Sequence, residues 1–216
     1  LHLCDRRQRQ MCIRDRMYIY ADNAATTKTS QAAIKAMNEC MEDFYGNPSS
    51  LHSVGQRAAE KLLQARMDVA ECLGADFKEI YFTSGGTESD NMALIGCAMA
   101  NKRRGSHIIT TMIEHPAVLE TAVFLERNGF EVTYLPVDST GCVKLEALRE
   151  ALRPETILVS MMYANNEVSA VEPVAEAAQI VKAYNPEIIF HTDAVQAFGK
   201  YRIIPKKELS LIHISE

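Results

Sequence analysis

Hydrophobic residues along this chain follow two spacings in turn: short apolar runs, and repeats of three to four residues. The runs predict strands over residues 79–83, 107–111, 131–135, 156–161 and 187–192. The repeats predict helices over residues 30–44, 56–73, 87–102, 116–128, 145–152 and 174–184. Strands that are apolar almost throughout, in alternation with helices, are typical of a mainly parallel sheet covered by helices on both faces. The pattern therefore predicts an α/β fold of this class.

Two of the predicted helices carry marked apolar faces. The helix over 30–44 should gather one set of side chains on a single face: Ala33, Met37, Cys40, Met41 and Phe44. The helix over 56–73 should turn another set inward: Ala59, Leu62, Leu63, Val69 and Leu73. Gly74 stands where a left-handed glycine commonly ends a helix. Pro116 suits a first helical turn, whose N–H groups have no partner within the helix.

Composition narrows the class of protein. A hydrophobic content of 47% and a charged content of 24% are those of an ordinary globular chain. The net charge of −5 gives no support for a nucleic-acid partner, and no apolar run approaches the roughly 20 residues that span a membrane. The six cysteines form no CxxC pair and no metal-ligand spacing. We expect Cys40, Cys72 and Cys97 to pack as small apolar side chains in a cytoplasmic protein.

The two ends of the sequence differ from the rest. Residues 1–16 carry five arginines and two aspartates without an apolar core, which does not match a secretory signal. Met17 then precedes the strand-like run at 18–20. Both CIRDR, within 1–16, and LSLIHISE, at the other end, resemble peptides translated from sequencing-adapter DNA. We therefore expect 1–16 and 210–216 to be non-native, with the native domain over 17–209.

Polar clusters follow four of the predicted strands. They are the segments Ser84–Glu88, Glu114–His115 and Asn165–Glu167, and the pair Asp193 and Gln196. Ligands of open α/β sheets bind outside the carboxyl ends of the strands. Four clusters at the same end of different strands therefore predict one shared site.

The glycine turn of the first cluster suits a phosphate. Gly85 and Gly86 allow the backbone to approach a ligand closely, and the helix that follows offers free N–H groups and its positive end. Thr87 can add a hydroxyl donor. The alternative is an ordinary strand-to-helix turn capped by Ser84 or Thr87.

The other three clusters also have two interpretations each. His115 can cap the helix that starts at Pro116 or offer a ring for stacking and proton transfer. Asn166 can form a turn or hold an oxygen of a ligand. Asp193, at the end of a buried strand, can cap a helix or pair with a protonated ring nitrogen. A phosphate cradle, a stacking imidazole, an amide and a buried carboxylate together match the needs of pyridoxal phosphate.

Six motifs in order give the sequence a specific resemblance: YIYADNAATT (18–27), GNPSS (46–50), FTSGGTESDN (82–91), Glu114-His115, NNE (165–167) and HTDAVQ (191–196). Together they closely resemble the cysteine desulfurases, which belong to the class V aminotransferase group of fold-type I pyridoxal-phosphate enzymes. The resemblance covers about residues 17–208, which correspond to the first half of such an enzyme. It implies that the domain over 17–209 is part of the large cofactor-binding domain.

The resemblance implies a role for each candidate residue. Gly86 and Thr87 would hold the cofactor phosphate. His115 would stack on the pyridine ring and take part in proton transfers. Asn166 would lie near the phenolic oxygen, to which Gln196 would donate a hydrogen bond. Asp193 would pair with the pyridinium nitrogen. The implied substrate is L-cysteine, the implied partners are sulfur acceptors or iron–sulfur scaffold proteins, and the implied assembly is a homodimer.

The sequence also departs from the family pattern. Members carry a Ser-x-His-Lys stretch whose lysine bonds covalently to the cofactor, and none follows Gln196 here, where the only lysines are Lys200, Lys206 and Lys207. The sulfur-accepting cysteine, the substrate-binding arginine and the small C-terminal domain have no counterpart either. We therefore expect the chain as printed to be inactive by itself. A related class V aminotransferase, a selenocysteine lyase and a non-catalytic pseudoenzyme remain the alternatives.

Overall fold

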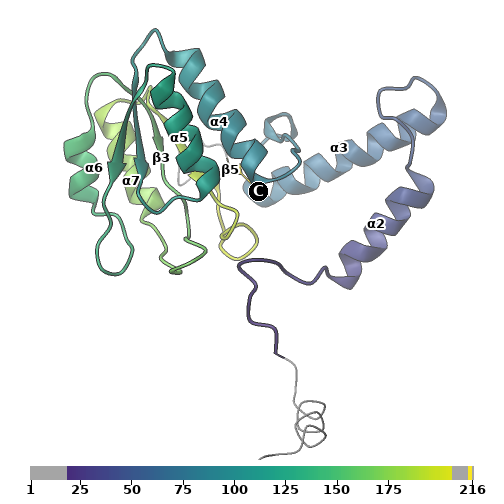
Figure 1. Cartoon of the computed structure of the whole chain (residues 1–216). Helices are drawn as coiled ribbons and strands as arrows, with labels where there is room; N and C mark the ends of the chain where they lie inside the picture. Colours follow the sequence, from purple (N-terminus) through teal and green to yellow (C-terminus); the bar gives the residue numbers. More distant parts are fainter. Residues whose placement is uncertain (1–18, 206–213, 216) are drawn as a thin grey trace, which may run out of the picture.

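A parallel sheet forms the centre of the computed structural model, which describes residues 19–205 and 214–215 (Figure 1). The strands lie in the order β2-β1-β3-β4-β5, and every neighbouring pair is parallel. Four strands have five residues each: β1 (His107–Thr111), β2 (Glu131–Leu135), β3 (Thr156–Ser160) and β4 (Ile189–Asp193). The fifth, β5 (Ile214–Ser215), adds two residues at the edge beside β4.

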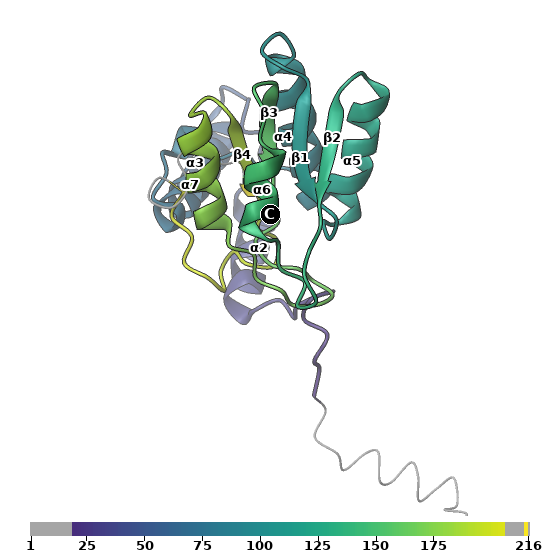
Figure 2. The same ribbon diagram turned by 90° about the vertical axis from the view of Figure 1, so that its left-hand side faces the viewer.

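Helices cover both faces of this sheet, as the sequence predicts. Helices α4 (Gly86–Asn101) and α5 (Pro116–Arg127) lie on one face, and α6 (Leu145–Ala151) and α7 (Val174–Tyr184) on the other (Figure 2). Each face has its own apolar core, because the strands present buried side chains to both sides. The predicted fold class is therefore confirmed.

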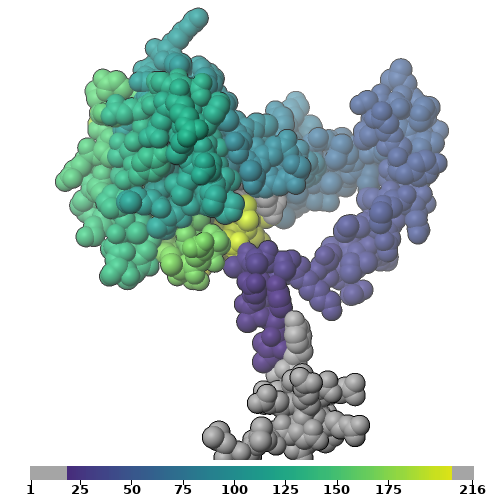
Figure 3. Space-filling model, in the orientation of Figure 1, coloured from purple at the N-terminus to yellow at the C-terminus, as the bar shows by residue number. Residues whose placement is uncertain are grey.

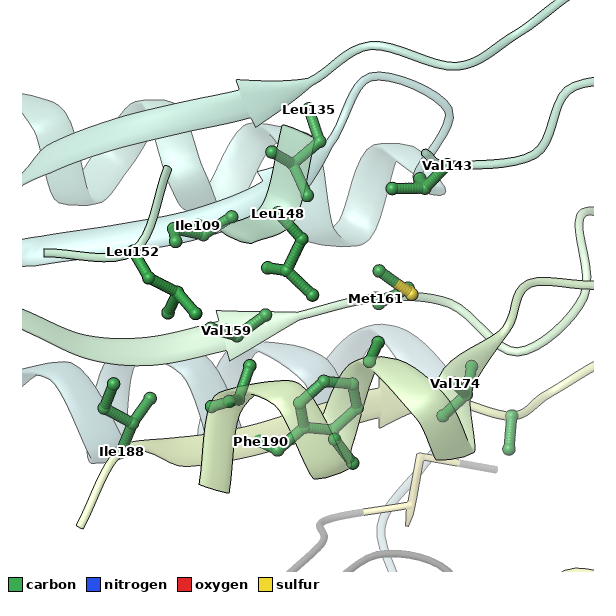
Figure 4. Close-up of a cluster of buried hydrophobic side chains, with 14 of the residues drawn as sticks. Ile109, Leu135, Val143, Leu148, Leu152, Val159, Met161, Val174, Ile188 and Phe190 are labelled. Carbon is green, nitrogen blue, oxygen red and sulfur yellow. The ribbon is translucent and has the colours of Figure 1, made fainter. Parts of the chain in front are cut away.

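The larger core lies between the sheet and helices α6 and α7 (Figure 4). Phe190 of β4 and Val159 of β3 are almost completely buried there, against Leu148 of α6. This packing holds β3 and β4 rigidly side by side. The loops that leave their carboxyl ends consequently start from fixed points.

Helices α2 (Gln31–Asp43) and α3 (Ser53–Leu73) extend away from the sheet (Figures 1 and 3). The predicted apolar face of α2 is present, but no residue of this helix is buried, and Met37 and Met41 are mostly exposed. In α3 the inward face is only partly correct, since Leu73 is buried but Leu63 is exposed. Cys72 is also exposed, against expectation. The helical repeat correctly marks apolar faces, but the described residues cover the face of α3 only in part and bury no residue of α2.

The predicted strand over 79–83 is wrong. A short 3₁₀ helix, η1 (Phe77–Glu79), occupies its start, and the residues up to α4 pair with no described strand. Tyr81 and Phe82 are exposed. An apolar run becomes a strand only where a neighbouring strand completes its hydrogen bonds. No described strand takes that place.

Two helix ends match their sequence signals. Gly74 has a left-handed backbone after α3, with φ of 61°, and its N–H bonds back to the helix. Pro116 occupies the first turn of α5. None of the helices within 19–205 is long and apolar enough to cross a membrane. The expectation that 1–16 and 210–216 are non-native concerns residues outside the described part, apart from β5.

Candidate functional site at the carboxyl edge of the sheet

Asp193 is the last residue of β4 and is 6% exposed. Its Oδ1 accepts a hydrogen bond from the Val195 N–H at 2.9 Å. Burial raises the pKa of this carboxyl group and the Asp90 charge raises it further, while the Val195 bond and the His191 and His115 rings act in the opposite direction. Among the described residues Asp193 forms no ion pair. It is therefore a buried acid without a cation of its own.

The first turn of α4 presents free backbone donors. Gly85 is the N-cap, and no side chain bonds to the turn from that position. Glu88 instead accepts bonds from the Ser84 N–H and hydroxyl, both at 2.7 Å, and these bonds lower the pKa of the Glu88 carboxyl. A cap by Ser84 or Thr87 is therefore not what the structure shows. The uncapped positive end of α4 suits an anion such as phosphate.

His115 caps helix α5. Its Nδ1 accepts a hydrogen bond from the Ala117 N–H at 3.1 Å, so the capping interpretation is confirmed. The ring is exposed, and its Nε2 bonds to no other described residue. It lies close enough to Asp193 to lower the pKa of that carboxyl group. The cap therefore orients the ring next to Asp193 and leaves its second nitrogen available.

The two asparagines after β3 have different roles: one forms the turn, and the other keeps a free amide. Asn165 shapes the turn: its Oδ1 accepts the Glu167 and Val168 N–H groups at 2.8 Å each, and its Nδ2 donates to the Ile113 carbonyl at 2.8 Å. Asn166 is half-buried, and its side chain makes no hydrogen bond with the described residues. Asn165 thus ties the loop after β3 to the loop after β1, and Asn166 retains a free amide.

Gln196 connects the site to the N-terminal segment. Its Nε2 donates to the Ala24 carbonyl at 3.0 Å, and its Oε1 accepts from the Lys200 Nζ at 3.2 Å. Ala24 and Gln196, which belong to two motifs far apart in the sequence, therefore meet at one place. The bond to Ala24 uses one of the two N–H groups of the Gln196 amide, so the other can donate to a ligand.

A layer of buried polar side chains lies beneath these groups, and the sequence pattern did not reveal it. His191 of β4 lies 3.5 Å from Asp90 of α4 through its Nε2, and 2.9 Å from the Ser160 hydroxyl of β3 through its Nδ1. Asp90, Ser160 and His191 are each 1% exposed. Two signals could have marked them: an aspartate inside an apolar helix, and a histidine two residues before Asp193 on the same side of the strand.

Glu114 belongs to the same layer. Its Oε1 accepts bonds from the Thr111 hydroxyl at 2.8 Å and the Met162 N–H at 2.9 Å, so it joins the ends of β1 and β3. Burial raises the pKa of the Glu114 carboxyl to about 8, and the Asp193 and Asp90 charges contribute. Glu114 is consequently a neutral carboxylic acid over most of the pH range near neutrality.

Three of the four predicted clusters are therefore linked by direct contacts or by charge. The loops after β1, β3 and β4 meet through Glu114, Asn165 and the bond from the Tyr163 N–H to the Asp193 carbonyl. The turn at Gly86 and Thr87 joins them through Asp90, one helical turn further along α4. The predicted strand before that turn is absent, but the shared edge of the sheet exists.

Several known proteins are similar to this chain. The "Aminotransferase class-V" family model matches residues 19–208. Cysteine desulfurase IscS of Methanosarcina thermophila is 49% identical over 198 residues, which are 91% of this chain and 48% of that protein. Putative cysteine desulfurase IscS 1 of Bacillus subtilis is 46% identical, over 91% of this chain and 52% of its own length.

Solved structures agree with these relatives. A NifS-like protein superposes with a TM-score of 0.86 at 45% identity and covers 88% of this chain and 52% of its own. SspA in complex with cysteine gives 0.84 at 36% identity, over 91% of this chain and 56% of its own. The chain thus spans about half the length of the proteins it matches. By the extent of the family match, the chain belongs to the class V aminotransferases.

Proposed function

We propose that this chain supplies the pyridoxal-phosphate-binding half of a cysteine desulfurase. The observation that carries the proposal is Asp193, a buried carboxylate with one hydrogen bond and no described cation. Such a group is costly unless a ligand brings a positive charge to it. The donors fit the same cofactor at its other end, because the first turn of α4 is uncapped and can bind a phosphate.

Each site residue has a defined task in this proposal. The N–H groups of Gly86 and Thr87, with the Thr87 hydroxyl, hold the phosphate. Asp193 keeps the ring nitrogen protonated, and His115 stacks on the ring and moves protons through its free Nε2. Asn166 and Gln196 orient the phenolic oxygen. The bound cofactor supplies an electron sink for bonds at the substrate's α-carbon.

The proposed substrate is L-cysteine, and the similar SspA structure is a complex with cysteine. Its sulfur passes to a cysteine thiol of the enzyme, so that L-alanine leaves and a persulfide remains. Sulfur acceptors and iron–sulfur scaffold proteins would then receive the sulfur. The free cysteines of the described residues, which include Cys40 and Cys142, suit a reducing cytoplasm.

Cofactor binding is the first test. We expect the chain to bind pyridoxal phosphate at least about 10-fold more tightly than pyridoxal, because the charge-assisted phosphate bonds contribute upwards of about 1.5 kcal/mol. Fluorescence titration of both compounds measures this ratio. Equal affinities would contradict the phosphate cradle at Gly86 and Thr87.

The substrate is tested by supplying the second half. Mixing this chain with the separately expressed C-terminal half of the Methanosarcina thermophila relative, in the presence of cofactor, should release L-alanine from L-cysteine. L-Serine serves as the control substrate and should give no alanine. A mixture that co-purifies and binds cofactor but forms no alanine would contradict the desulfurase assignment.

We also propose that the protein is a homodimer. The exposed apolar face of α2, which includes Met37 and Met41, supports a protein partner because contiguous apolar surface of this kind marks interaction sites. Light scattering should give twice the mass of the chain. Replacement Met41→Glu should shift it towards the monomer, and an unchanged mass would exclude this face from the interface.

A further inference from the structure

We propose that Asp90, His191 and Ser160 form a clamp that sets the distance between the first turn of α4 and Asp193. The three side chains form a continuous line across three elements: Asp90 Oδ1 to His191 Nε2 at 3.5 Å, and His191 Nδ1 to Ser160 Oγ at 2.9 Å. Each is 1% exposed, so water does not compete for these contacts. The assignment of a ligand to the two ends of the clamp rests on the proposed function.

The positions of the three residues connect both halves of the site. Asp90 follows Gly86 by four residues and Thr87 by three, so it lies on their side of α4, one turn below the proposed phosphate position. His191 precedes Asp193 by two residues, so both point to the same side of β4. A contact between Asp90 and His191 therefore fixes α4 relative to Asp193 along the line that a bound cofactor would span.

Ser160 holds the middle of the clamp in place. It lies opposite His191 in the parallel ladder between β3 and β4. The hydrogen bond between its hydroxyl and Nδ1 of His191 orients the imidazole ring, so that the other ring nitrogen faces α4. Strand register thus determines the direction of the ring.

The other contacts between α4 and the sheet define the position of this helix less sharply than the contact of Asp90 does. The other buried residues of α4 are apolar: Ala93, Leu94 and Ala98. Burial of apolar surface stabilises the contact but is not directional, so it tolerates sliding of the helix. The interaction of the Asp90 carboxylate with the His191 ring nitrogen depends on the separation of the two groups, so it favours one position of the helix.

Loss of Asp90 should affect stability as well as position. Asp90 Oδ1 is buried and has no hydrogen-bond partner in the described part of the chain, since the 3.5 Å to His191 is an ion-pair distance. Removing one partner of a buried pair is destabilising, so a variant at Asp90 should also lower the melting temperature. Ligand discrimination and local exchange therefore test the clamp, each against a control variant that is destabilised away from the site.

The test compares Asp90→Leu with a matched control, His107→Leu. Like the clamp residues, His107 is buried and polar. Its ring nitrogens contact the Thr156 and Thr133 hydroxyls, but it lies at the amino end of β1, away from the site. Asp90→Leu should lower the preference for pyridoxal phosphate over pyridoxal at least about 5-fold. His107→Leu should leave this preference unchanged, even where it lowers the melting temperature. Asp90→Asn, which keeps an acceptor for the ring, should restore part of the preference.

A second readout needs no ligand. Hydrogen exchange of the Glu88 and Ser89 amides, which bond to the Gly85 carbonyl, should become at least about 5-fold faster in Asp90→Leu than in the unchanged chain. The His107→Leu control should show no such local change. Unaltered exchange in Asp90→Leu would overturn the clamp. Faster exchange with no phosphate preference in the unchanged chain would support the clamp and contradict the proposed cofactor.

Discussion

Replacing Asp193 by asparagine should weaken the binding of pyridoxal phosphate by at least about 100-fold. Removing one partner from a buried ion pair costs about 3–5 kcal/mol, because the other charge stays buried without compensation. Asp193 is 6% exposed, so little water could replace the lost carboxylate. Fluorescence titration of the cofactor against the unchanged chain and the variant measures the effect.

The matched control is Glu155→Gln. Glu155 is an exposed carboxylate just before the amino end of β3, at the opposite end of the sheet, and its neutralisation should leave the affinity unchanged. A cofactor analogue with carbon in place of the ring nitrogen sharpens the test. It should bind the unchanged chain and Asp193→Asn with similar affinity, since it has no charge for Asp193 to meet. A large loss for the analogue too would assign Asp193 a structural role instead.

The free energy of unfolding should fall as the pH rises from about 4.5 to about 8, and Glu114 should be a main cause. Its pKa is about 8 in the folded chain and 4.5 as the ordinary value, so between these limits the unfolded chain loses a proton that the folded chain keeps. Each pKa unit corresponds to about 1.4 kcal/mol, which makes the expected loss several kcal/mol. Below 4.5 and above 8 Glu114 adds no slope.

Glu114→Gln isolates this contribution. Glutamine retains an oxygen for the Thr111 hydroxyl and the Met162 N–H, and its amide group replaces the neutral acid. Denaturant titrations should show the variant close to the unchanged chain at pH 4.5 and clearly more stable at pH 8. Parallel pH profiles for the two proteins would show that Glu114 ionises normally in the fold.

The central strands could be predicted because both of their faces are buried. Ile109 and Val159 pack under α6 and α7 while their neighbours Ile108 and Leu158 pack under α4 and α5, so the sequence there is apolar without interruption. The run at 79–83 has similar composition, but its strand character depends on a partner that the described residues do not provide. The apolar face of α2 is exposed for the same reason, because the described residues bury no residue of this helix.

The sequence predicts where the site lies, but it does not predict the contacts among the side chains that build it. Parallel strands end at one edge, so spacing alone brings Glu114, Asn165 and Asp193 to the same place. The contacts of Asp90 and Ser160 depend on strand register and on the rotation of α4, which the hydrophobic pattern does not specify. Spacing also did not distinguish Asn165, which builds the turn, from Asn166, whose amide stays free.

Asp193 should hold the pyridine nitrogen of the bound cofactor in its protonated form. Nitrogen NMR of pyridoxal phosphate labelled with ¹⁵N in the ring measures this protonation, with the cofactor bound to the unchanged chain and to Asp193→Asn at pH 8. We expect the chemical shift of a protonated nitrogen in the unchanged chain and of an unprotonated nitrogen in the variant. An unprotonated nitrogen in both proteins, with the cofactor bound, would show that Asp193 does not pair with a pyridinium nitrogen.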